Sequence, residues 1–299
     1  MIKDSGNHMD LTEGKEKSKE YYDQVAQTYK QMYEENYDKY PANLIRLKLL
    51  IKKLKETNTK TVLDVGCGTC TPMIRLLKEG FDVRGCDFSS EMIKIGKDQL
   101  IKEKFDPNLI SQGDVEDDLS LPDGKFDSIL ALGVFPHLVD ESKALQNLKK
   151  RLNNNGQVFI EFRNELFALF SSNKYTIDLI LNKMINFDSC TQEIQIDLIE
   201  FYSKMYGVEK PKKNQNGKIS YDEILARFRN PLTIQEDIFS KNGFVVKNIH
   251  FYHYHALPPI FAEKYPKFFK DNSMQLEQPS DWRGNFMASA FVVEAGLRI

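Results

Sequence analysis

The segment Thr61–Cys70, TVLDVGCGTC, decides the fold of this chain. Its first five residues have the apolar, β-branched character of a short buried strand, and a helical pattern begins at Thr71. Between strand and helix, Gly66 and Gly68 allow a tight turn whose backbone can lie against a ligand. Asp64, near the end of the strand, is placed either to accept hydrogen bonds from a charged amine of that ligand or to orient the turn. The segment therefore predicts a nucleotide-like cofactor at a strand–turn–helix junction.

Two cofactor classes are compatible with such a junction. A dinucleotide site needs a third glycine, in the pattern G-x-G-x-x-G, but Thr71 stands at that position. The order acid-x-Gly-x-Gly at Asp64–Gly68 instead resembles the first motif of class I S-adenosylmethionine-dependent methyltransferases. That family usually has a further glycine two residues on, where this chain has Cys70. The resemblance implies S-adenosylmethionine as cofactor, contacted by Asp64, Gly66, Cys67 and Gly68.

The next strand candidate, Phe81–Cys86, runs into Asp87. In the resembled family, an acid after the second strand binds the ribose hydroxyls of the cofactor, so the resemblance assigns that role to Asp87. It also implies that Phe88 lies against the adenine. Ser89 is the expected N-cap of the following helix.

Two more strand candidates continue the same order, Leu109–Gly113 and Phe126–Leu132. After the first, the loop that begins at Asp114 resembles the adenine-contacting loop of the family, with Asp114 accepting from the adenine amino group. After the second, the loop that begins at Gly133 is expected to face the reacting sulfonium. The resemblance thus adds Asp114, Val115, Leu132 and Gly133 to the cofactor site.

Two segments ahead of the first motif have helical periodicity, Tyr21–Tyr40 and Leu44–Leu54. In the family, a helix at this place often folds over the cofactor, which makes tyrosines of the first segment candidates to line the site. The alternative is that they only pack one face of a helix. Arg46, in the second segment, is a candidate to reach the cofactor carboxylate or, alternatively, a solvated side chain. The cofactor-site candidates from these segments are Tyr21, Tyr29 and Arg46.

Histidines are the candidates for general-base catalysis. His137 lies in the loop after the fourth strand, near the expected methyl group. His253 and His255 end the sixth strand candidate, where strand alternation places them on one face. Removal of a proton from a hydroxyl acceptor favours such a group. Tyr252 and Tyr254, expected on the opposite face, are an open alternative.

Metal and redox chemistry find little support in the sequence. Cys67 and Cys70 form a C-x-x-C without a partner pair, so two small residues filling a turn are expected instead. His253 and His255 are adjacent on one face, but no carboxylate cluster flanks them, so no metal is expected.

The predicted fold class is α/β: a Rossmann-like, seven-stranded methyltransferase sheet whose last strand is antiparallel, as the resemblance implies. Residues 1–19 are expected to be a disordered tail, and residues 20–163 and 231–299 the core with its N-terminal helical flap. Residues 164–230 are rich in apolar side chains and are interpreted as an inserted helical lid over the acceptor pocket.

Composition narrows the partners. The net charge of −2 over 299 residues does not favour nucleic-acid binding, and no apolar run has the length of a membrane span. The absence of a signal peptide makes a cytoplasmic location the default expectation, with a homodimer left open.

An enclosed small molecule is the expected methyl acceptor, because a macromolecule needs an open groove. O-methylation of a sugar or a similar hydroxylated compound is the first hypothesis. N-methylation of a small amine is the second. A tRNA or protein methyltransferase and a non-catalytic cofactor-binding module are the remaining alternatives.

Overall fold

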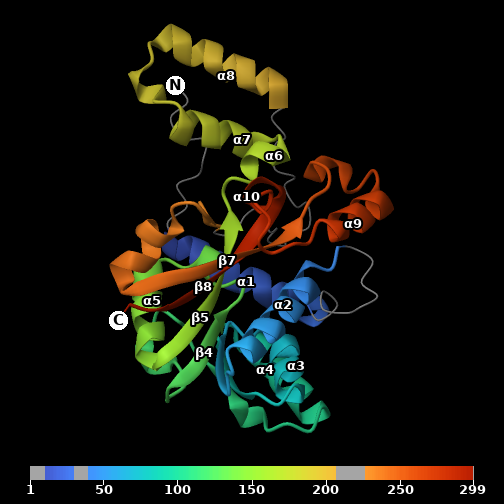
Figure 1. The fold of residues 1–299 in the computed structure, drawn as a ribbon, viewed down its shortest axis with the longest axis vertical. Helices are drawn as coiled ribbons and strands as arrows, with labels where there is room; N and C mark the ends of the chain where they lie inside the picture. The colour runs from blue at the N-terminus through green and yellow to red at the C-terminus, as the bar shows by residue number, and fades with distance from the viewer. Residues whose placement is uncertain (1–10, 30–39, 207–225, 299) are drawn as a thin grey trace.

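The structure, a computed structural model, describes residues 11–29, 40–206 and 226–298. Its core is one sheet with the strand order β3-β2-β1-β4-β5-β8-β7, and the short strand β6 pairs with β5 (Figure 1). The strands are β1 Thr61–Val65, β2 Asp82–Asp87, β3 Ile110–Gln112, β4 Phe126–Ala131, β5 Leu152–Asn164, β6 Phe228–Arg229, β7 Phe244–Tyr254 and β8 Ala288–Leu297. β8 runs antiparallel to β5 and β7, which confirms the predicted antiparallel last strand.

Two apolar layers fill the space on the two faces of the sheet, because side chains alternate along each strand. Leu63 and Ile129 belong to the layer that contains Leu145 of α5. Val62 and Leu130 belong to the other layer, with side chains from α2, α3 and α4. The covering helices are α2 Ala42–Glu56, α3 Thr71–Lys78, α4 Ser90–Lys102 and α5 Glu141–Arg151. This arrangement leaves the ends of the strands for loops that bind ligands.

The chain reverses its strand order between β1 and β4. β1 pairs in parallel with both β2 and β4, so the loops after β1 and β4 leave the sheet side by side. In open α/β sheets, ligands bind outside the carboxyl ends of the strands at such a point. The fold therefore brings the Gly66 turn close to the loop that begins at Gly133.

Helix α1, Leu11–Tyr29, packs on α4 and on the 3₁₀ turn Phe135–His137. The prediction of a disordered tail through residue 19 is therefore wrong for residues 11–19. The polar sequence of this helix does not predict its tertiary contacts. Ser18 is buried, and Lys15 forms ion pairs with two carboxylates.

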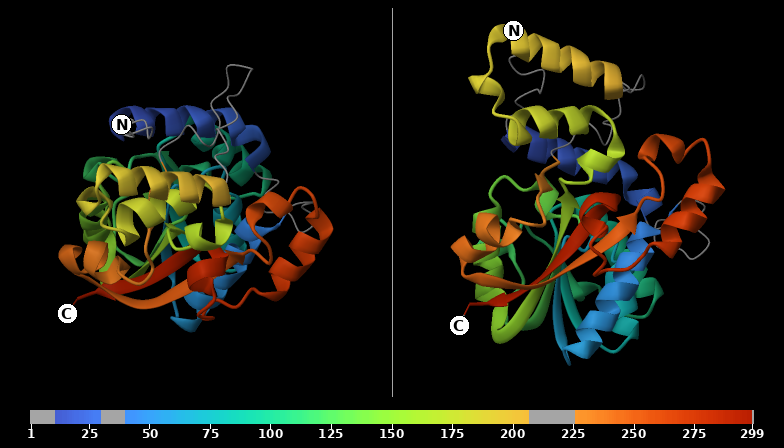
Figure 2. Two further views of the ribbon diagram at one scale, coloured as in Figure 1. Left: turned by 90° about the horizontal axis from the view of Figure 1, so that it is seen from above. Right: turned by 45° about the horizontal axis from the view of Figure 1, so that its top comes forward.

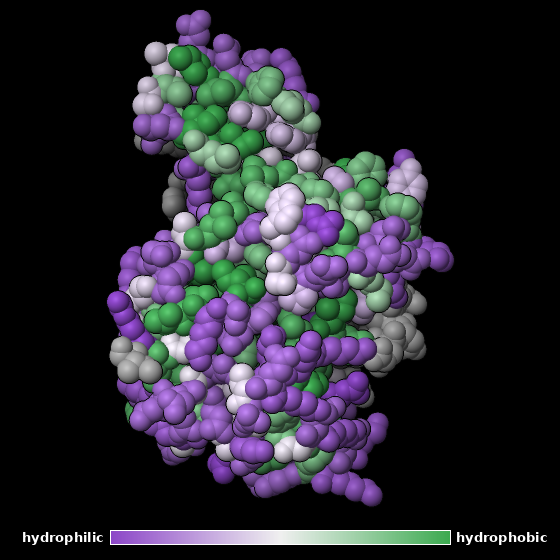
Figure 3. Space-filling model, viewed as in Figure 1, coloured by the Kyte–Doolittle hydropathy of each residue, from purple (hydrophilic) through white to green (hydrophobic). Residues whose placement is uncertain are grey.

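The region after β5 is helical, as predicted, and projects beyond the sheet (Figures 1 and 2). It contains α6 Ala168–Ser171, α7 Lys174–Leu179 with a π-helical turn to Met184, and α8 Gln192–Tyr206. α8 buries none of its described residues, and Ile196, Phe201 and Met205 are more than half exposed. Figure 3 shows apolar side chains gathered on this projection. Its role as a lid stays a prediction.

Two short helices follow β7, α9 Pro266–Gln275 and α10 Gly284–Met287. The segment before β7 is a π-helical turn Gln235–Phe239 followed by a 3₁₀ turn. Gly243 then takes a left-handed φ of 78° and ends it, as the Asn-Gly sequence indicates.

Candidate functional site

The glycine turn after β1 depends on three residues with positive φ. Gly66 has φ 72°, Gly68 has φ 53° and Cys70, directly before α3, has φ 62°. A Cβ on Gly66 would lie 2.3 Å from Cγ2 of Val134, so the loop after β4 excludes any side chain there. Cys70 adopts a left-handed conformation at the position where the resembled family usually has glycine. The turn is therefore formed despite this substitution.

Asp64 and Asp87 place two buried carboxyl groups beside this turn. The Oδ2 atom of Asp64 has no hydrogen-bond partner within the described part of the chain. Burial, and then the negative charge of Asp87, raise the pKa of Asp64 to about 7. Asp87 Oδ2 accepts from the backbone N–H of Gly68 at 2.8 Å, and Oδ1 accepts from Ser89 N–H at 2.9 Å. Burial raises the pKa of Asp87 to about 6, against the lowering effect of these two donors.

A cavity of about 80 Å³ lies over the turn. The predicted cofactor-site residues that line it are Asp64, Gly66, Cys67, Gly68, Asp87, Phe88, Asp114, Val115, Leu132 and Gly133. Lys15 and Tyr22, both from α1, line it as well. The free, buried Asp64 Oδ2 and a turn open to close backbone approach fit a ligand that carries an amine and hydroxyl groups. These residues therefore fit S-adenosylmethionine chemically.

A second, larger cavity of about 770 Å³ adjoins the first. Tyr22, Gly133 and His137 line both cavities, so the two meet at these residues. Aromatic side chains form much of the larger cavity: Tyr21, Tyr40, Phe167, Tyr175, Phe228 and Tyr252. Polar groups among them include Asn43, Asn164 and Asn182. The cavity has the mixed apolar and polar lining of a small-molecule site.

His137 is buried at the junction of the two cavities. Its Nε2 atom lies 3.0 Å from the hydroxyl oxygen of Tyr22. The 3₁₀ turn Phe135–His137 after β4 holds it there, and α1 supplies the tyrosine. A hydrogen bond to one ring nitrogen fixes the orientation of an imidazole. His137 therefore lies where the sequence predicts it, with a partner that sequence reasoning did not assign to it.

His253 lines the larger cavity, and its ring stacks on Tyr40 with centroids 5.0 Å apart. Its φ of 61° interrupts the strand alternation, so Tyr252 and His253 both line this cavity while Tyr254 packs into the opposite apolar layer. The expectation that both tyrosines face away from His253 is thus wrong for Tyr252. Burial, and then the nearby Arg46 cation, lower the pKa of His253 to about 4, which makes its imidazole neutral at pH 7.

His255 is buried beside His253, with ring centroids 4.9 Å apart, but it lines neither of the two cavities. Its ring also contacts Phe167 and Phe269. Both ring nitrogens lack a partner among the described residues. Burial, and then His253, lower its pKa well below the ordinary value. Its position behind Phe167 separates it from the acceptor space that the sequence predicts for it.

Arg46 lines the larger cavity and forms a buried ion pair with Glu161. Its guanidinium carbon lies 5.8 Å from the ring centre of Tyr252. Sequence reasoning missed Glu161, although a single acid within the apolar run of β5 is a signal that could have found it. The predicted contact of Arg46 with the cofactor carboxylate stays a prediction.

Three residues of α1 remain to be placed. Tyr21 lines the larger cavity, whereas the side chain of Tyr29 falls outside the described residues. Sequence reasoning missed Lys15, which lines the smaller cavity, because it lies in the segment predicted to be disordered.

Within the described ranges, no group of three or more His, Cys, Asp or Glu side chains is arranged to hold a metal ion. None of the helices described is both long and apolar enough to cross a membrane.

Comparison with known proteins matches residues 63–160 to the methyltransferase domain. The chain is 28% identical over 165 residues to a ubiquinone/menaquinone biosynthesis C-methyltransferase of Geotalea daltonii, covering 54% of this chain and 69% of that enzyme. It is 35% identical over 124 residues to a glycine/sarcosine N-methyltransferase of Parasynechococcus marenigrum. That match covers 38% of this chain and 42% of the relative, so the chain spans less than half of its length.

Solved structures share the fold. A magnesium protoporphyrin IX methyltransferase from Synechocystis, crystallised with S-adenosylhomocysteine, has a TM-score of 0.54 at 13% identity, covering 96% of this chain and 100% of that one. A methyltransferase from Clostridium acetobutylicum has a TM-score of 0.51 at 11% identity, covering 85% and 91%. The domain match identifies residues 63–160 as a methyltransferase domain, and together with the glycine turn and the shared fold it supports a class I S-adenosylmethionine-dependent methyltransferase.

Proposed function

We propose that this methyltransferase methylates a hydroxyl group of a small, ring-containing molecule, such as a sugar or a similar hydroxylated compound. The smaller cavity takes the cofactor and the larger one takes the acceptor. The observation that carries this proposal is their shared wall of Tyr22, Gly133 and His137. At this wall the acceptor oxygen and the methyl group can meet.

When bound, S-adenosylmethionine supplies a methyl group already activated by a sulfonium. The chain's own residues hold and orient it. Asp64, with its free Oδ2, binds the amine of the cofactor. Asp87, held rigid by Gly68 and Ser89, accepts from the ribose hydroxyls. Asp114 accepts from the purine amino group. Such positioning supplies much of the rate of a group transfer, since it fixes the two reacting atoms in line.

His137 is the proposed general base. Its ring is fixed by Tyr22 at the junction of the cavities, so that an acceptor hydroxyl entering from the larger cavity meets it there. General-base assistance of this kind contributes about 10²- to 10⁴-fold to the rate. His253, which is neutral at pH 7 because of its lowered pKa, is proposed to orient the acceptor as a hydrogen-bonding partner.

The lining of the larger cavity supports an acceptor with a ring. Its volume of about 770 Å³ lies within the 300–1,000 Å³ that small-molecule sites span. Tyr40 and Tyr175 offer aromatic surfaces, and Asn43 and Asn182 offer hydrogen bonds for hydroxyl groups. Arg46 is already bound to Glu161, which leaves that wall close to neutral.

A second candidate is N-methylation of a small amine. Asp178 lines the larger cavity, and a carboxylate there attracts ammonium groups, whereas Glu161 and Glu165 of the same lining already pair with Arg46 and Lys183. The likeness to a glycine/sarcosine N-methyltransferase is consistent with it. The cavity is much larger than an amino acid of that size needs, which is why O-methylation is proposed first.

The experiment that tests the proposal is an acceptor screen that measures S-adenosylhomocysteine formation from sugars, phenols and amines. Turnover with a hydroxylated ring compound, lost in His137→Ala while S-adenosylhomocysteine still binds, supports the proposal. Turnover with amines alone, at an undiminished rate in His137→Ala, overturns it in favour of N-methylation.

A further inference from the structure

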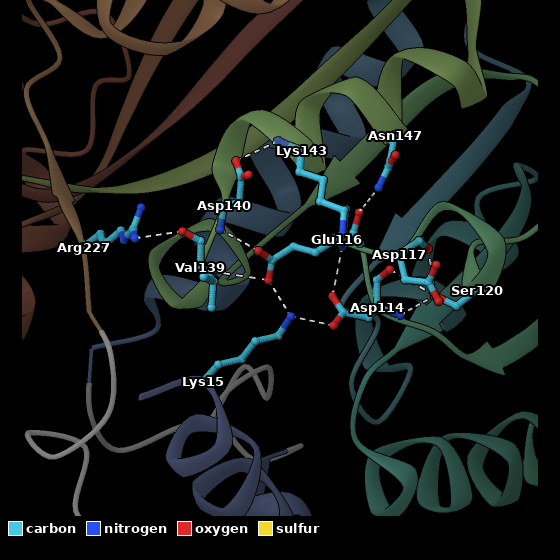
Figure 4. A network of polar contacts seen from close by, with 11 residues as sticks. Lys15, Asp114, Glu116, Asp117, Ser120, Val139, Asp140, Lys143, Asn147 and Arg227 are labelled. Atoms are coloured by element: carbon cyan, nitrogen blue, oxygen red, sulfur yellow. Dashed lines mark hydrogen bonds and ion pairs between the residues drawn. The ribbon is translucent and has the colours of Figure 1, made fainter. Parts of the chain in front are cut away.

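One ion-pair network links Asp114, the proposed partner of the purine amino group, to residues with no assigned role, Lys15 and Glu116. It joins α1 to the loop after β3, at the edge of the smaller cavity (Figure 4). Lys15 Nζ lies 2.5 Å from Asp114 Oδ2 and also pairs with Glu116. The Lys15 side chain is 22% exposed, that of Glu116 is 9% exposed and that of Asp114 is 34% exposed, so the pair with Glu116 is the more shielded of the two. Shielded pairs of this kind are screened by salt less than exposed ones.

Glu116 is itself held by the rest of the molecule. Its carboxylate accepts from the backbone N–H of Asp140 at 2.5 Å and of Val139 at 3.4 Å, directly before α5. The carbonyl oxygen of Val139 in turn accepts from Arg227 at 2.9 Å. Figure 4 shows Lys15 reaching from α1 to this fixed acidic group. One end of α1 is therefore tied to the rigid core through the Lys15 side chain.

The same face of α1 forms the roof of the smaller cavity. Lys15, Ser18, Tyr22 and Val25 recur at spacings of three and four residues, which places them on one side of a helix. Lys15 and Tyr22 line the smaller cavity, whereas Val25 lines the larger one. Lys15 lies beside Asp114, and Tyr22 beside His137. The helix thus spans the smaller cavity from the Asp114 end to its junction with the acceptor space.

The space beneath this roof is too small for the cofactor. The cavity measures about 80 Å³, whereas small-molecule sites span about 300–1,000 Å³. Gly66 N–H donates to the carbonyl of Cys86 in β2, and Gly68 N–H donates to the carboxylate of Asp87, so the floor is tied to the sheet. The roof, helix α1, contacts the residues around this cavity through side chains such as Lys15 and Tyr22. Accommodating the cofactor therefore requires α1 to lift, and Lys15 opposes that movement.

We propose that Lys15 is a latch residue: its bridge to Asp114 and Glu116 holds α1 closed over the cofactor cavity and sets the rate of cofactor exchange. This inference rests on the proposed placement of the cofactor in the smaller cavity. Lys15 opens for the cofactor to pass and closes again on Glu116 once it is inside. A latch of this kind slows association and dissociation together, so its removal accelerates both while the affinity changes little.

The charge of Lys15 is secured by its partners. Burial alone would lower the pKa of Lys15, but the Asp114 and Glu116 carboxylates raise it above its ordinary value. The latch therefore stays cationic across the physiological range. Lys17, two residues on, pairs with Glu13 within the same helix and provides a matched control.

The test measures association and dissociation rates of S-adenosylhomocysteine by surface plasmon resonance on the full chain. Lys15→Met removes the charge and keeps an unbranched helix-forming side chain. We expect both rates to rise at least fivefold in Lys15→Met with the dissociation constant within threefold of the wild type. Lys17→Met should match the wild type, and Lys15→Arg should restore slow exchange.

Two results would overturn the latch. Unchanged rates in Lys15→Met would mean that the bridge does not limit exchange. A weaker affinity with an unchanged association rate would make Lys15 an ordinary binding residue. Asp87→Asn distinguishes a failure of the latch from a failure of the proposed cofactor site. A wild-type affinity for S-adenosylhomocysteine in Asp87→Asn would refute the proposed site, independently of the result for Lys15.

Discussion

Asp64 is buried, and one of its carboxyl oxygens has no hydrogen-bond partner among the described residues. This environment destabilises the ionised carboxylate, and a bound cation would stabilise it. A carboxylate without a partner in a buried site is unfavourable, so burial shifts its pKa upward to about 7. A cationic amine restores the ionised form by pairing with it. This environment supports the proposed role of Asp64 in binding the amine of the cofactor.

The pH dependence of cofactor binding follows from this shift. The ionised form of Asp64 binds, and its pKa in the free protein is about 7, so the protonated, non-binding fraction grows as pH falls below that value. Each pH unit below the pKa weakens binding by up to about tenfold. Titration calorimetry with S-adenosylhomocysteine from pH 5.5 to 8.5 should show affinity rising up to pH 7 and levelling above it. Asp64→Asn should remove the part of this rise above about pH 6, where Asp87 is largely ionised, and an equally steep rise there in that variant would refute the role of Asp64.

The His137–Tyr22 contact gives a second prediction at the residue scale. Tyr22→Phe removes the hydroxyl that holds the imidazole of His137 but keeps the aromatic ring of this α1 residue. We expect kcat to fall about tenfold, with KM for the cofactor within threefold of the wild type, because only the orientation of the base is lost. Steady-state kinetics on the identified acceptor check this. A change confined to KM would mean that Tyr22 binds a substrate and does not orient the base.

Among the elements, those with a local signal agree most closely with the sequence. β1 has the predicted bounds, because an apolar run that ends directly before Gly66 defines it. Cys70 shows why the glycine turn survives without its usual third glycine: it takes the left-handed conformation, and Gly96 leaves room for its sulfur atom. A Cβ at Gly96 would lie 2.7 Å from that sulfur, so the compensation comes from a residue distant in sequence.

Elements and contacts without a local signal were not predictable. Nothing in the polar sequence of residues 11–19 indicates a helix, because its order comes from carboxylates on a loop that follows it by about a hundred residues. The positive φ of His253 and the pairing of Arg46 with Glu161 likewise depend on tertiary packing. The sequence predicts which loops form the cofactor site, but not what covers it.

The N-cap of α4 gives a prediction at the element scale. Ser89 Oγ accepts from Met92 N–H at 3.0 Å and also contacts Asp23 of α1. Ser89→Ala should lower the free energy of unfolding by about 1 kcal/mol through loss of the cap. Urea denaturation followed by circular dichroism measures this. Ser90→Ala, at an exposed neighbouring position, is the control, and an equal loss in both variants would contradict the assignment of the cap.

At the scale of the whole molecule, the smaller cavity is formed mainly by the sheet and its loops, and the larger cavity also by segments outside the sheet. The sheet reversal between β1 and β4 fixes the cofactor loops. α1, α2 and the residues after β5 supply most of the wall of the larger cavity, where the proposed acceptor binds. The methyltransferase domain match ends at residue 160, just before the segment that supplies Glu161, Arg163 and Asn164 to the larger cavity.

The central claim is that the smaller cavity binds the adenosyl cofactor through Asp64 and Asp87. Calorimetric titration of the wild type and Asp87→Ala with S-adenosylhomocysteine, with NAD as the control ligand, tests it most directly. We predict micromolar binding of S-adenosylhomocysteine, none of NAD, and a loss of about 1.5–3 kcal/mol in Asp87→Ala. Equal affinity of Asp87→Ala and the wild type, with the variant folded by circular dichroism, would contradict the claim.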